Sequence, residues 1–340
     1  MKVMQVMAGA EFGGAEAFFV RLVSGLHRAG LDQRVIIRAN AARAERLREA
    51  GLDPVQLKFG GPLDLGTKLA MRSEIRHYQP DIVLSWMSRA TAAVPSGKFV
   101  HVARLGGYYD AKYYQRCDHL IANTRDIADY LVKEGWPAER VHFLRNFVEP
   151  QTAEPESRRA HYTPENAPLI LALGRLHENK AFDVLLEALA RVPSTYLWLA
   201  GEGPLRGELE SLAEKLGIKP RVRFLGWSDN TAALFAAADL FVCPSRHEPL
   251  GNVVIEAWAA GVPVIATDSL GPGTLIEQGR TGLLVPVDDA NSLAHAIRRA
   301  LEDGPLRDAL AESGYAAYQA EYTEEIGIAA YLDLFKSLTG

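Results

Sequence analysis

Residues 243–267 constrain the fold more than any other stretch, because a strand, a loop, a helix and a second strand follow one another there. An apolar strand ends at Cys243, and Pro244 stops its hydrogen-bond ladder because proline has no N–H to donate. After a loop, apolar residues at helical spacing lead to Gly261, where a C-cap is expected. Residues 262–267 then form the next buried strand.

This unit carries two carboxylates, Glu248 in the loop and Glu256 one turn inside the helix. Loop amides at a helix start attract anions, while carboxylates accept hydrogen bonds from hydroxyl groups. A ligand with both phosphates and hydroxyls, such as a sugar nucleotide, would use both features. A single glutamate is usually a solvated surface residue, but Glu256 lies within an apolar run, where a solvated face is not expected.

The composition indicates a soluble protein of two domains. At 340 residues the chain is longer than a usual single domain, and its 48% hydrophobic and 23% charged residues fit a substantial core. The longest apolar runs have the length of strands, so we expect neither a signal peptide nor a transmembrane helix. Cys117 and Cys243 supply neither a disulfide framework nor a metal cluster. These features predict a cytoplasmic protein.

Charge is unevenly divided between the halves. Residues 1–150 hold 21 Lys/Arg and 16 Asp/Glu, a net charge of +5, whereas the remainder holds 16 and 26, a net charge of −10. The basic half fits contact with an anionic membrane or a lipid-linked phosphate, and equally a chance scatter of charge. The Arg-rich segment 41–50 is likewise either a headgroup-binding face or a solvated one. The excess is too small to indicate nucleic-acid binding.

Strand-like and helix-like segments alternate along the first half, which predicts a doubly wound α/β domain. Gly13 and Gly14 follow the first strand, where glycines let backbone amides approach a bulky ligand. A plain tight turn explains these two glycines as well. Residues 150–168 hold four prolines and mixed charges, so they predict an interdomain connection.

The second half opens with a buried strand at 169–173, then Gly174, and then two cations, Arg175 and Lys180, near a helix start. Two cations at a helix start suit a diphosphate leaving group, although loop Arg and Lys are mostly surface charges. Residues 201–207 do not match a dinucleotide fingerprint, because the last glycine is displaced by one and Pro204 intervenes. A dehydrogenase is therefore disfavoured.

Four ordered elements resemble retaining glycosyltransferases of the GT-B fold, family 4. They are Gly13-Gly14-Ala15-Glu16, the segment 174–183 with Ala181 in place of the family's glycine, the Gly201-x-Gly203 loop, and Glu248-x7-Glu256 with its flanks. The resemblance implies an α/β fold of two Rossmann-like doubly wound domains facing each other across a cleft. It implies an acceptor-binding domain at 1–150, a linker at 151–168, a nucleotide-sugar domain at 169–315, and a C-terminal helix at 316–340 packing on the first domain.

The resemblance also implies roles for individual residues. Arg175, Lys180 and Glu248 would be catalytic, the cations at the departing nucleotide phosphate and Glu248 at the donor-sugar hydroxyls. Glu256 would hold the ribose hydroxyls, and the other donor-binding residues would be Gly13, Gly14, Glu16, Gly174, Leu250, Gly251, Asn252 and Trp227. Trp227 could equally be a core residue, and Arg104 and Tyr108 would lie near the acceptor or in aromatic packing. Family members commonly have a histidine near the end of the strand expected at 99–105. That histidine has no counterpart here, and His101 is not given its role.

The implied reaction moves a sugar from a nucleotide-sugar donor, with a UDP-sugar favoured, to an acceptor hydroxyl with retention, forming an α-glycosidic bond. We expect no metal and no cofactor, because no D-x-D pair or His/Cys cluster is evident. The expected acceptor is a glycan or a lipid-linked molecule in lipopolysaccharide or other cell-surface glycan biosynthesis, with peripheral contact at the inner face of the plasma membrane. The alternatives are a sugar-nucleotide epimerase of the same fold, which would release a free epimer without an acceptor, and a non-catalytic sugar-nucleotide-binding protein.

Overall fold

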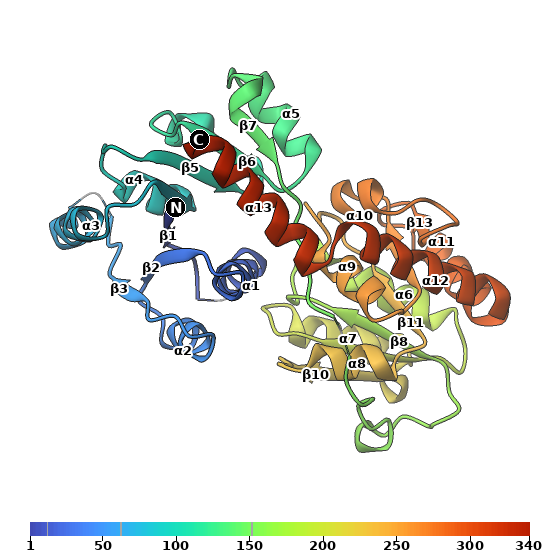
Figure 1. The fold of residues 1–340 in the computed structure, drawn as a ribbon. Coiled ribbons are helices and arrows are strands. Elements are labelled where there is room, and N and C mark those ends of the chain that lie inside the picture. Colours follow the sequence, from blue (N-terminus) through green and yellow to red (C-terminus); the bar gives the residue numbers. More distant parts are fainter. Residues whose placement is uncertain (12, 62, 151) are drawn as a thin grey trace. The chain divides into compact units, whose positions relative to one another are not determined.

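The chain divides into two α/β units, each built on a parallel sheet. A computed structural model describes residues 1–11, 13–61, 63–150 and 152–340. The first unit consists of residues 1–147 and 324–340, and the second of residues 148–323. We describe each unit by itself; both are drawn in Figure 1.

The described residues of the first unit form a seven-stranded sheet in the order β3-β2-β1-β4-β5-β6-β7, with every pair of neighbours parallel. The strands are β1 (Lys2–Met7), β2 (Asp32–Arg38), β3 (Val55–Leu57), β4 (Ile82–Trp86), β5 (Val100–Leu105), β6 (His119–Ala122) and β7 (Val141–Phe143). The helices are α1 (Gly14–Arg28), α2 (Ala41–Glu49), α3 (Leu65–Tyr78), α4 (Ser88–Ala93), α5 (Arg125–Lys133) and α13 (Glu324–Thr339), with short 3-10 turns η1 (Ala111–Tyr113) and η2 (Ala138–Arg140).

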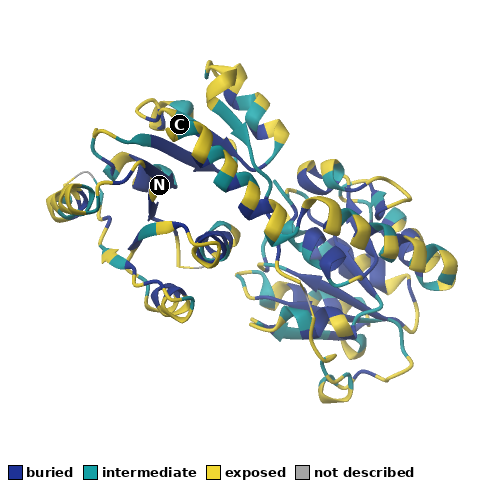
Figure 2. Ribbon diagram, viewed as in Figure 1, coloured by how far each residue is buried: buried dark blue, intermediate teal, exposed yellow. Residues whose placement is uncertain are grey.

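Helices cover both faces of this sheet, which is why its central strands read as continuous apolar runs (Figure 2). One face packs against α1, α2 and α13, and the other against α3 and α4. Helix α13 belongs here despite its distance in sequence: the ring hydroxyl of Tyr331 accepts a hydrogen bond of 3.0 Å from Arg104 Nε, and Arg28 pairs with Glu324 at 2.6 Å. Helix α13 therefore packs within the first unit.

The second unit contains a six-stranded sheet, again parallel throughout its described residues, in the order β10-β9-β8-β11-β12-β13. Its strands are β8 (Leu169–Leu173), β9 (Tyr196–Ala200), β10 (Val222–Gly226), β11 (Leu240–Cys243), β12 (Val264–Thr267) and β13 (Leu283–Val285). Its helices are α6 (Phe182–Ala190), α7 (Arg206–Lys215), α8 (Thr231–Ala237), α9 (Asn252–Ala259), α10 (Leu270–Leu275), α11 (Ala290–Glu302) and α12 (Gly304–Glu321), with 3-10 turns η3 (Arg159–His161), η4 (Glu178–Lys180) and η5 (Lys219–Arg221).

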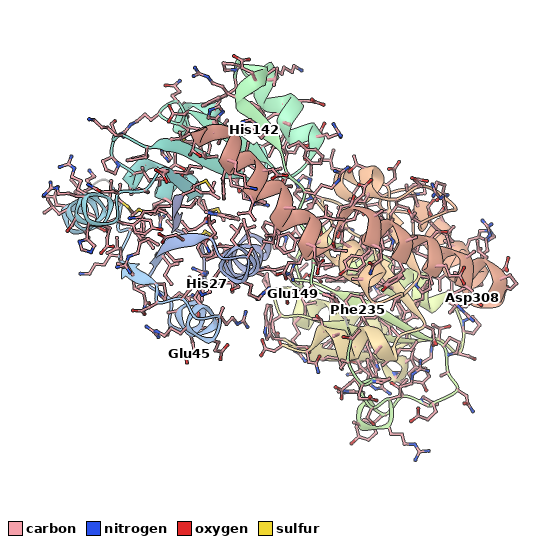
Figure 3. The ribbon with its side chains drawn as sticks, viewed as in Figure 1. His27, Glu45, His142, Glu149, Phe235 and Asp308 are labelled. Atoms are coloured by element: carbon pink, nitrogen blue, oxygen red, sulfur yellow. The ribbon has the colours of Figure 1, made fainter. Side chains whose placement is uncertain are left out.

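Strand order reverses between β8 and β11, so the connections from these two neighbouring strands leave in opposite directions. In open α/β sheets, ligands bind outside the carboxyl ends of the strands at such a switch point. Helices α6, α7 and α11 cover one face of the sheet, and α8, α9 and α12 cover the other, with Phe235 of α8 in the latter core (Figure 3). The fold therefore predicts a ligand site at the loops that follow β8 and β11.

Two predicted domain limits need correction. Residues 151–168 were expected to be a linker, but the described residues of this segment are part of the second unit. Arg158 holds it there, donating hydrogen bonds to the carbonyl oxygens of Ala237 and Ala167 and pairing with Asp239 at 3.1 Å. The composition predicted an interdomain linker without tertiary contacts. It could not reveal the hydrogen bonds of Arg158 to Ala237 and Asp239, because these residues are far from Arg158 in sequence.

The segment predicted to return to the first domain begins at 324 rather than at 316. Residues 304–321 form α12, whose Tyr318 is buried in the same core as Trp258 of α9. A Cβ atom on Gly314 would overlap the Trp258 ring, so glycine lets α12 lie close against α9. The chain leaves the helix at Tyr322, and α13 then begins the contacts with the first unit.

Gly327 of α13 provides a test of this packing. A Cβ atom there would overlap the ring of Phe147, so Gly327→Ala is expected to lower the free energy of unfolding by roughly 1–3 kcal/mol through overpacking. Gly207→Ala is the matched control, because Gly207 is also helical and has no atom within 4 Å of an added Cβ. The control should gain about 1 kcal/mol from helix propensity. Urea unfolding measures both, and equal midpoints for the two variants would contradict the packing.

Candidate active site

The candidate site lies at the switch point of the second sheet, where the loops after β8 and β11 meet. The β8 loop runs from Gly174 to Ala181 and carries Arg175 and Lys180, and the β11 loop runs from Pro244 to Gly251 and carries Glu248. The loops are joined through their backbones, since the His247 N–H donates to the carbonyl oxygen of Asn179 at 3.1 Å. The predicted phosphate-binding and sugar-binding residues are thus neighbours.

Lys180 and Glu248 form an ion pair at the centre of this site. Their side chains are only 22% and 13% exposed, so water screens the pair little. Burial by itself lowers the pKa of Lys180, but the adjacent charge of Glu248 more than offsets it, and the pKa lies above its ordinary value. The ammonium is therefore charged at neutral pH, and its contribution to stability is lost as pH rises beyond that ordinary value of 10.5.

Arg246 holds the same loops together from the side. Its guanidinium forms two parallel hydrogen bonds with Asp183, Nη1 to Oδ1 at 3.0 Å and Nη2 to Oδ2 at 2.6 Å. It also pairs with Asp288 and donates to the carbonyl oxygen of Glu178 at 2.9 Å. A planar guanidinium matches a carboxylate in this two-point geometry. Arg246 therefore fixes the β8 loop, and with it Lys180, relative to Glu248.

Sequence reasoning did not single out Arg246. Asp183 is the last residue of the segment 174–183 that carries the family resemblance. The available signal was an arginine two residues before Glu248, in a loop that follows a predicted parallel strand, as the first turn of the helix containing Asp183 does.

Glycines allow the neighbouring β9 loop to lie directly on the β8 loop. A Cβ atom on Gly201 would overlap the carbonyl oxygen of Gly174, and one on Gly203 would overlap that of Leu176. Gly174 and Gly201 also have φ of 149° and 140°, a region open mainly to glycine. The loops are hydrogen-bonded, with the Leu176 N–H donating to the Glu202 carbonyl at 3.0 Å. The Gly-x-Gly element therefore supports the loop that carries Arg175.

Arg175 in the β8 loop and Trp227 after β10 both have exposed side chains. Within the part of the chain that the structure describes, Arg175 makes no hydrogen bond or ion pair, so its guanidinium is available to a ligand. Trp227 follows β10, is 61% exposed, and donates from its indole N–H to Asp229 at 3.1 Å. Of the two interpretations of Trp227, the core residue is wrong.

The start of α9 brings the remaining predicted donor-binding residues together. Gly251 precedes the helix with φ of 81°, and its N–H lies 3.4 Å from Glu248 Oε1. Asn252 and Glu256 are four residues apart on α9 and so share one face, where both are half-buried. Leu250 lies against Gly271, whose N–H donates to the Glu248 carbonyl at 2.7 Å.

In the first unit, Glu16 turns back over the loop after β1. The side chain of this α1 residue is buried, and its Oε1 accepts a hydrogen bond of 2.7 Å from the Ala10 N–H. An added Cβ on Gly13 would overlap the Glu16 carboxylate, so glycine makes room for the acid, and Gly14 begins the helix. The predicted Gly-Gly-x-Glu element is thus a compact turn at the carboxyl end of β1.

Arg43 supports the same turn from α2. Its Nη2 donates to the Ala10 carbonyl at 2.6 Å, and its side chain is buried. Burial lowers its pKa, partly opposed by the charge of Glu16. Arg43 therefore cannot belong to a headgroup-binding face on 41–50.

Arg104 and Tyr108 differ in their surroundings. Arg104 is only 4% exposed, because its guanidinium contacts the Phe18 and Trp86 rings and donates to Asn146 and Tyr331. These contacts bury its donors in the first unit, so of the two interpretations of Arg104 the structure favours aromatic packing. Tyr108 is partly exposed, and its hydroxyl donates to Asp126.

His101 is buried beneath this region and bonds to Ser85 at 3.0 Å. Burial lowers its pKa to about 4, so it is neutral at physiological pH. Among the described residues, no three or more His, Cys, Asp or Glu side chains are grouped so that they could hold a metal ion. None of the described helices is both long and apolar enough to cross a membrane.

Comparison with known proteins places the whole chain in one family. The "Glycosyltransferase Family 4" model matches residues 12–152, and the "Glycosyl transferases group 1" model matches residues 153–317. The lipopolysaccharide core biosynthesis glycosyltransferase LpsE of Rhizobium meliloti is 37% identical, with 99% of each sequence covered. The chain is a family 4 glycosyltransferase.

Two further comparisons agree with this family. LpsD of the same organism, also described as a lipopolysaccharide core biosynthesis glycosyltransferase, is 37% identical over 98% of each sequence. The structure of Anabaena HepE in complex with UDP-glucose has a TM-score of 0.86 and 20% identity, covering 99% of this chain and 100% of that one. The likeness to HepE confirms the GT-B fold.

Both matched segments of the glycosyltransferase contain residues described above. The 153–317 match holds Arg175, Lys180 and Glu248 with the Arg246 contacts, and the 12–152 match holds Glu16. The predicted GT-B fold and family are confirmed, whereas the role of each site residue stays a prediction.

The pairing of Arg246 with Asp183 can be measured by a double-mutant cycle. Arg246→Gln and Asp183→Asn should each lower the free energy of unfolding, and the double variant should fall short of their sum by about 0.5–1 kcal/mol, as expected for a partly exposed pair. Urea unfolding of all four proteins gives the coupling. Strict additivity would show that the two side chains do not hold the loops together.

Proposed function

We propose that this glycosyltransferase transfers a sugar from a nucleotide-sugar donor, a UDP-sugar, to an acceptor hydroxyl with retention, forming an α-glycosidic bond in lipopolysaccharide core biosynthesis. The observation that carries the proposal is the half-buried Lys180–Glu248 pair beside exposed Arg175 at the switch point. It sets two cations and a carboxylate together where an open α/β sheet binds its ligand.

The two cations suit the diphosphate. Negative charge develops on the leaving phosphate as the sugar departs, and cations fixed before the reaction stabilise it without reorganisation. Lys180 is held in place by Glu248, and Arg175 has no competing partner among the described residues. We therefore assign transition-state stabilisation to Lys180 and Arg175. With this charge on the protein, the proposal needs no metal ion.

The carboxylates suit the hydroxyl groups of the donor. Glu248 accepts from the sugar hydroxyls, and Glu256, one turn inside α9, accepts from the ribose hydroxyls. Asn252 lies on the same face as Glu256 and adds an amide, while the exposed Trp227 offers a ring for the base. In the first unit, Gly13, Gly14 and Glu16 keep their proposed donor-binding role.

The proposed reaction is a front-face displacement. The acceptor oxygen bonds to the anomeric carbon on the face from which the diphosphate leaves, and the bond from that carbon to the phosphate oxygen breaks. The electron pair stays on the phosphate oxygen, which takes the proton of the acceptor hydroxyl. The products are the α-glycoside and the nucleoside diphosphate, and no enzyme carboxylate becomes glycosylated.

The relatives support the substrate classes. LpsE and LpsD act in lipopolysaccharide core biosynthesis, and HepE was solved with UDP-glucose bound. We propose by analogy a glycan or lipid-linked acceptor and peripheral contact of the cytoplasmic enzyme with the inner face of the membrane.

Separate roles for Glu256 and Glu248 can be tested by titrating UDP. Glu256→Ala should weaken UDP binding roughly 10- to 100-fold, because it removes a charged acceptor from the ribose hydroxyls. Glu248→Ala should mainly slow transfer, and Glu187→Ala, an exposed position on α6, is the matched control. Calorimetry gives the dissociation constants, and equal UDP affinity in wild type and Glu256→Ala would remove the ribose role.

A further inference from the structure

The first unit exposes three leucines around the start of α3. Leu63, Leu65 and Leu69 are 94%, 68% and 64% exposed. Scattered single apolar residues are ordinary on protein surfaces, but a contiguous apolar group on one helix marks an interaction site. Leu65 and Leu69 are four residues apart and so lie on one face of α3, and the ribbon of this helix is mostly coloured as exposed in Figure 2.

These leucines are presented by an ordered helix start. Asp64 accepts hydrogen bonds from the Thr67 hydroxyl and N–H and from the Gly60 N–H, and the bonds to Thr67 and Gly60 lower its pKa to about 2. The opposite side of α3 is anchored by buried Thr67 and Met71, the latter in the core of the unit. The leucines therefore face outward because the rest of the turn is fixed.

The same exposed surface is positively charged. The exposed positions of α3, all of which the structure describes, include Lys68, Arg72 and Arg76 but no acidic residue, so these three cations outnumber the one half-exposed acid at the helix start, Asp64. Its one glutamate, Glu74, is partly buried and pairs with Arg34 at 2.8 Å. Three leucines framed by cations match a bilayer with anionic headgroups, into which apolar side chains insert while cations remain at the phosphates.

Two other charged surfaces among the described residues of the unit lack this combination. The exposed charges of α2 are balanced, with Arg46 and Arg48 against Glu45 and Glu49, and Glu45 lies on its solvent side (Figure 3). Near the exposed tyrosines after β5, Lys112 pairs with Asp110. The surface formed by Leu63, Leu65, Leu69, Lys68, Arg72 and Arg76 is called the α3 surface below.

We propose that the α3 surface docks the enzyme on an anionic phospholipid bilayer, with the three leucines inserted at the level of the headgroups. This deepens the proposed function, because it names the surface from which a lipid-linked acceptor would be reached. Docking does not require sugar transfer, so the two proposals can fail separately.

Vesicle sedimentation of the full chain tests the docking. Wild type should bind vesicles of phosphatidylcholine and phosphatidylglycerol in equal parts, bind phosphatidylcholine alone at least about tenfold more weakly, and be released by salt. Leu63→Ser/Leu65→Ser/Leu69→Ser and Lys68→Gln/Arg72→Gln/Arg76→Gln should each lose about tenfold or more in binding. The matched control Val132→Ser/Tyr162→Ser changes exposed apolar residues elsewhere and should bind like wild type.

UDP binding measured on the same proteins separates the outcomes. Unchanged UDP affinity with lost vesicle binding supports the proposal. The proposal is overturned if wild type does not bind vesicles, if either α3 variant binds them as tightly as wild type, or if wild type binds neutral vesicles as tightly as anionic ones. Loss of a dimer in the leucine variant, seen by light scattering without any effect on vesicle binding, would identify the surface as a contact between copies and also overturn it.

Discussion

The ion pair between Lys180 and Glu248 is the interaction on which the rest of the site depends. Each residue comes from a different loop, and neither could stay partly buried without the opposite charge. The surrounding structure maintains this pairing. Arg246 of the β11 loop bonds to Asp183 of α6, and glycines let the β9 loop pack directly against the β8 loop. The site is thereby ordered before any donor binds, which is the condition for electrostatic catalysis.

Much of the fold was predictable because the determining signals are local. Apolar runs of strand length that alternate with helix-period segments predict two doubly wound sheets, and the confirmed GT-B fold contains them. The domain limits were less predictable. The segment around Arg158 has the composition of a linker, yet hydrogen bonds to Ala237 and Asp239, about 80 residues away in sequence, attach it to the second unit.

The candidate site shows the same division between local and distant signals. Lys180, Glu248 and Glu256 could be proposed as site residues from motifs. Lys180 belongs to the motif at 174–183 and the two glutamates to the one at 243–267, and each motif is recognised by spacing within its own segment. Arg246 escaped notice because its partner Asp183 is 63 positions away. The two interpretations of Arg104 stayed open for a related reason: its position at the end of β5 suggests exposure to a ligand, but its partner Tyr331 lies 227 positions away on α13. Burial of a charged residue depends on packing that the sequence does not display locally.

We infer that Lys180 stabilises the leaving diphosphate, and the turnover of Lys180→Ala decides whether it does. The donor is the nucleotide sugar that raises the melting temperature of the wild type most, and the measured quantity is nucleoside diphosphate released at saturating donor. The account predicts that kcat falls roughly 10²- to 10³-fold, while Lys215→Ala, an exposed lysine on α7, leaves it unchanged. A Lys180→Ala enzyme with the kcat of wild type would contradict the account.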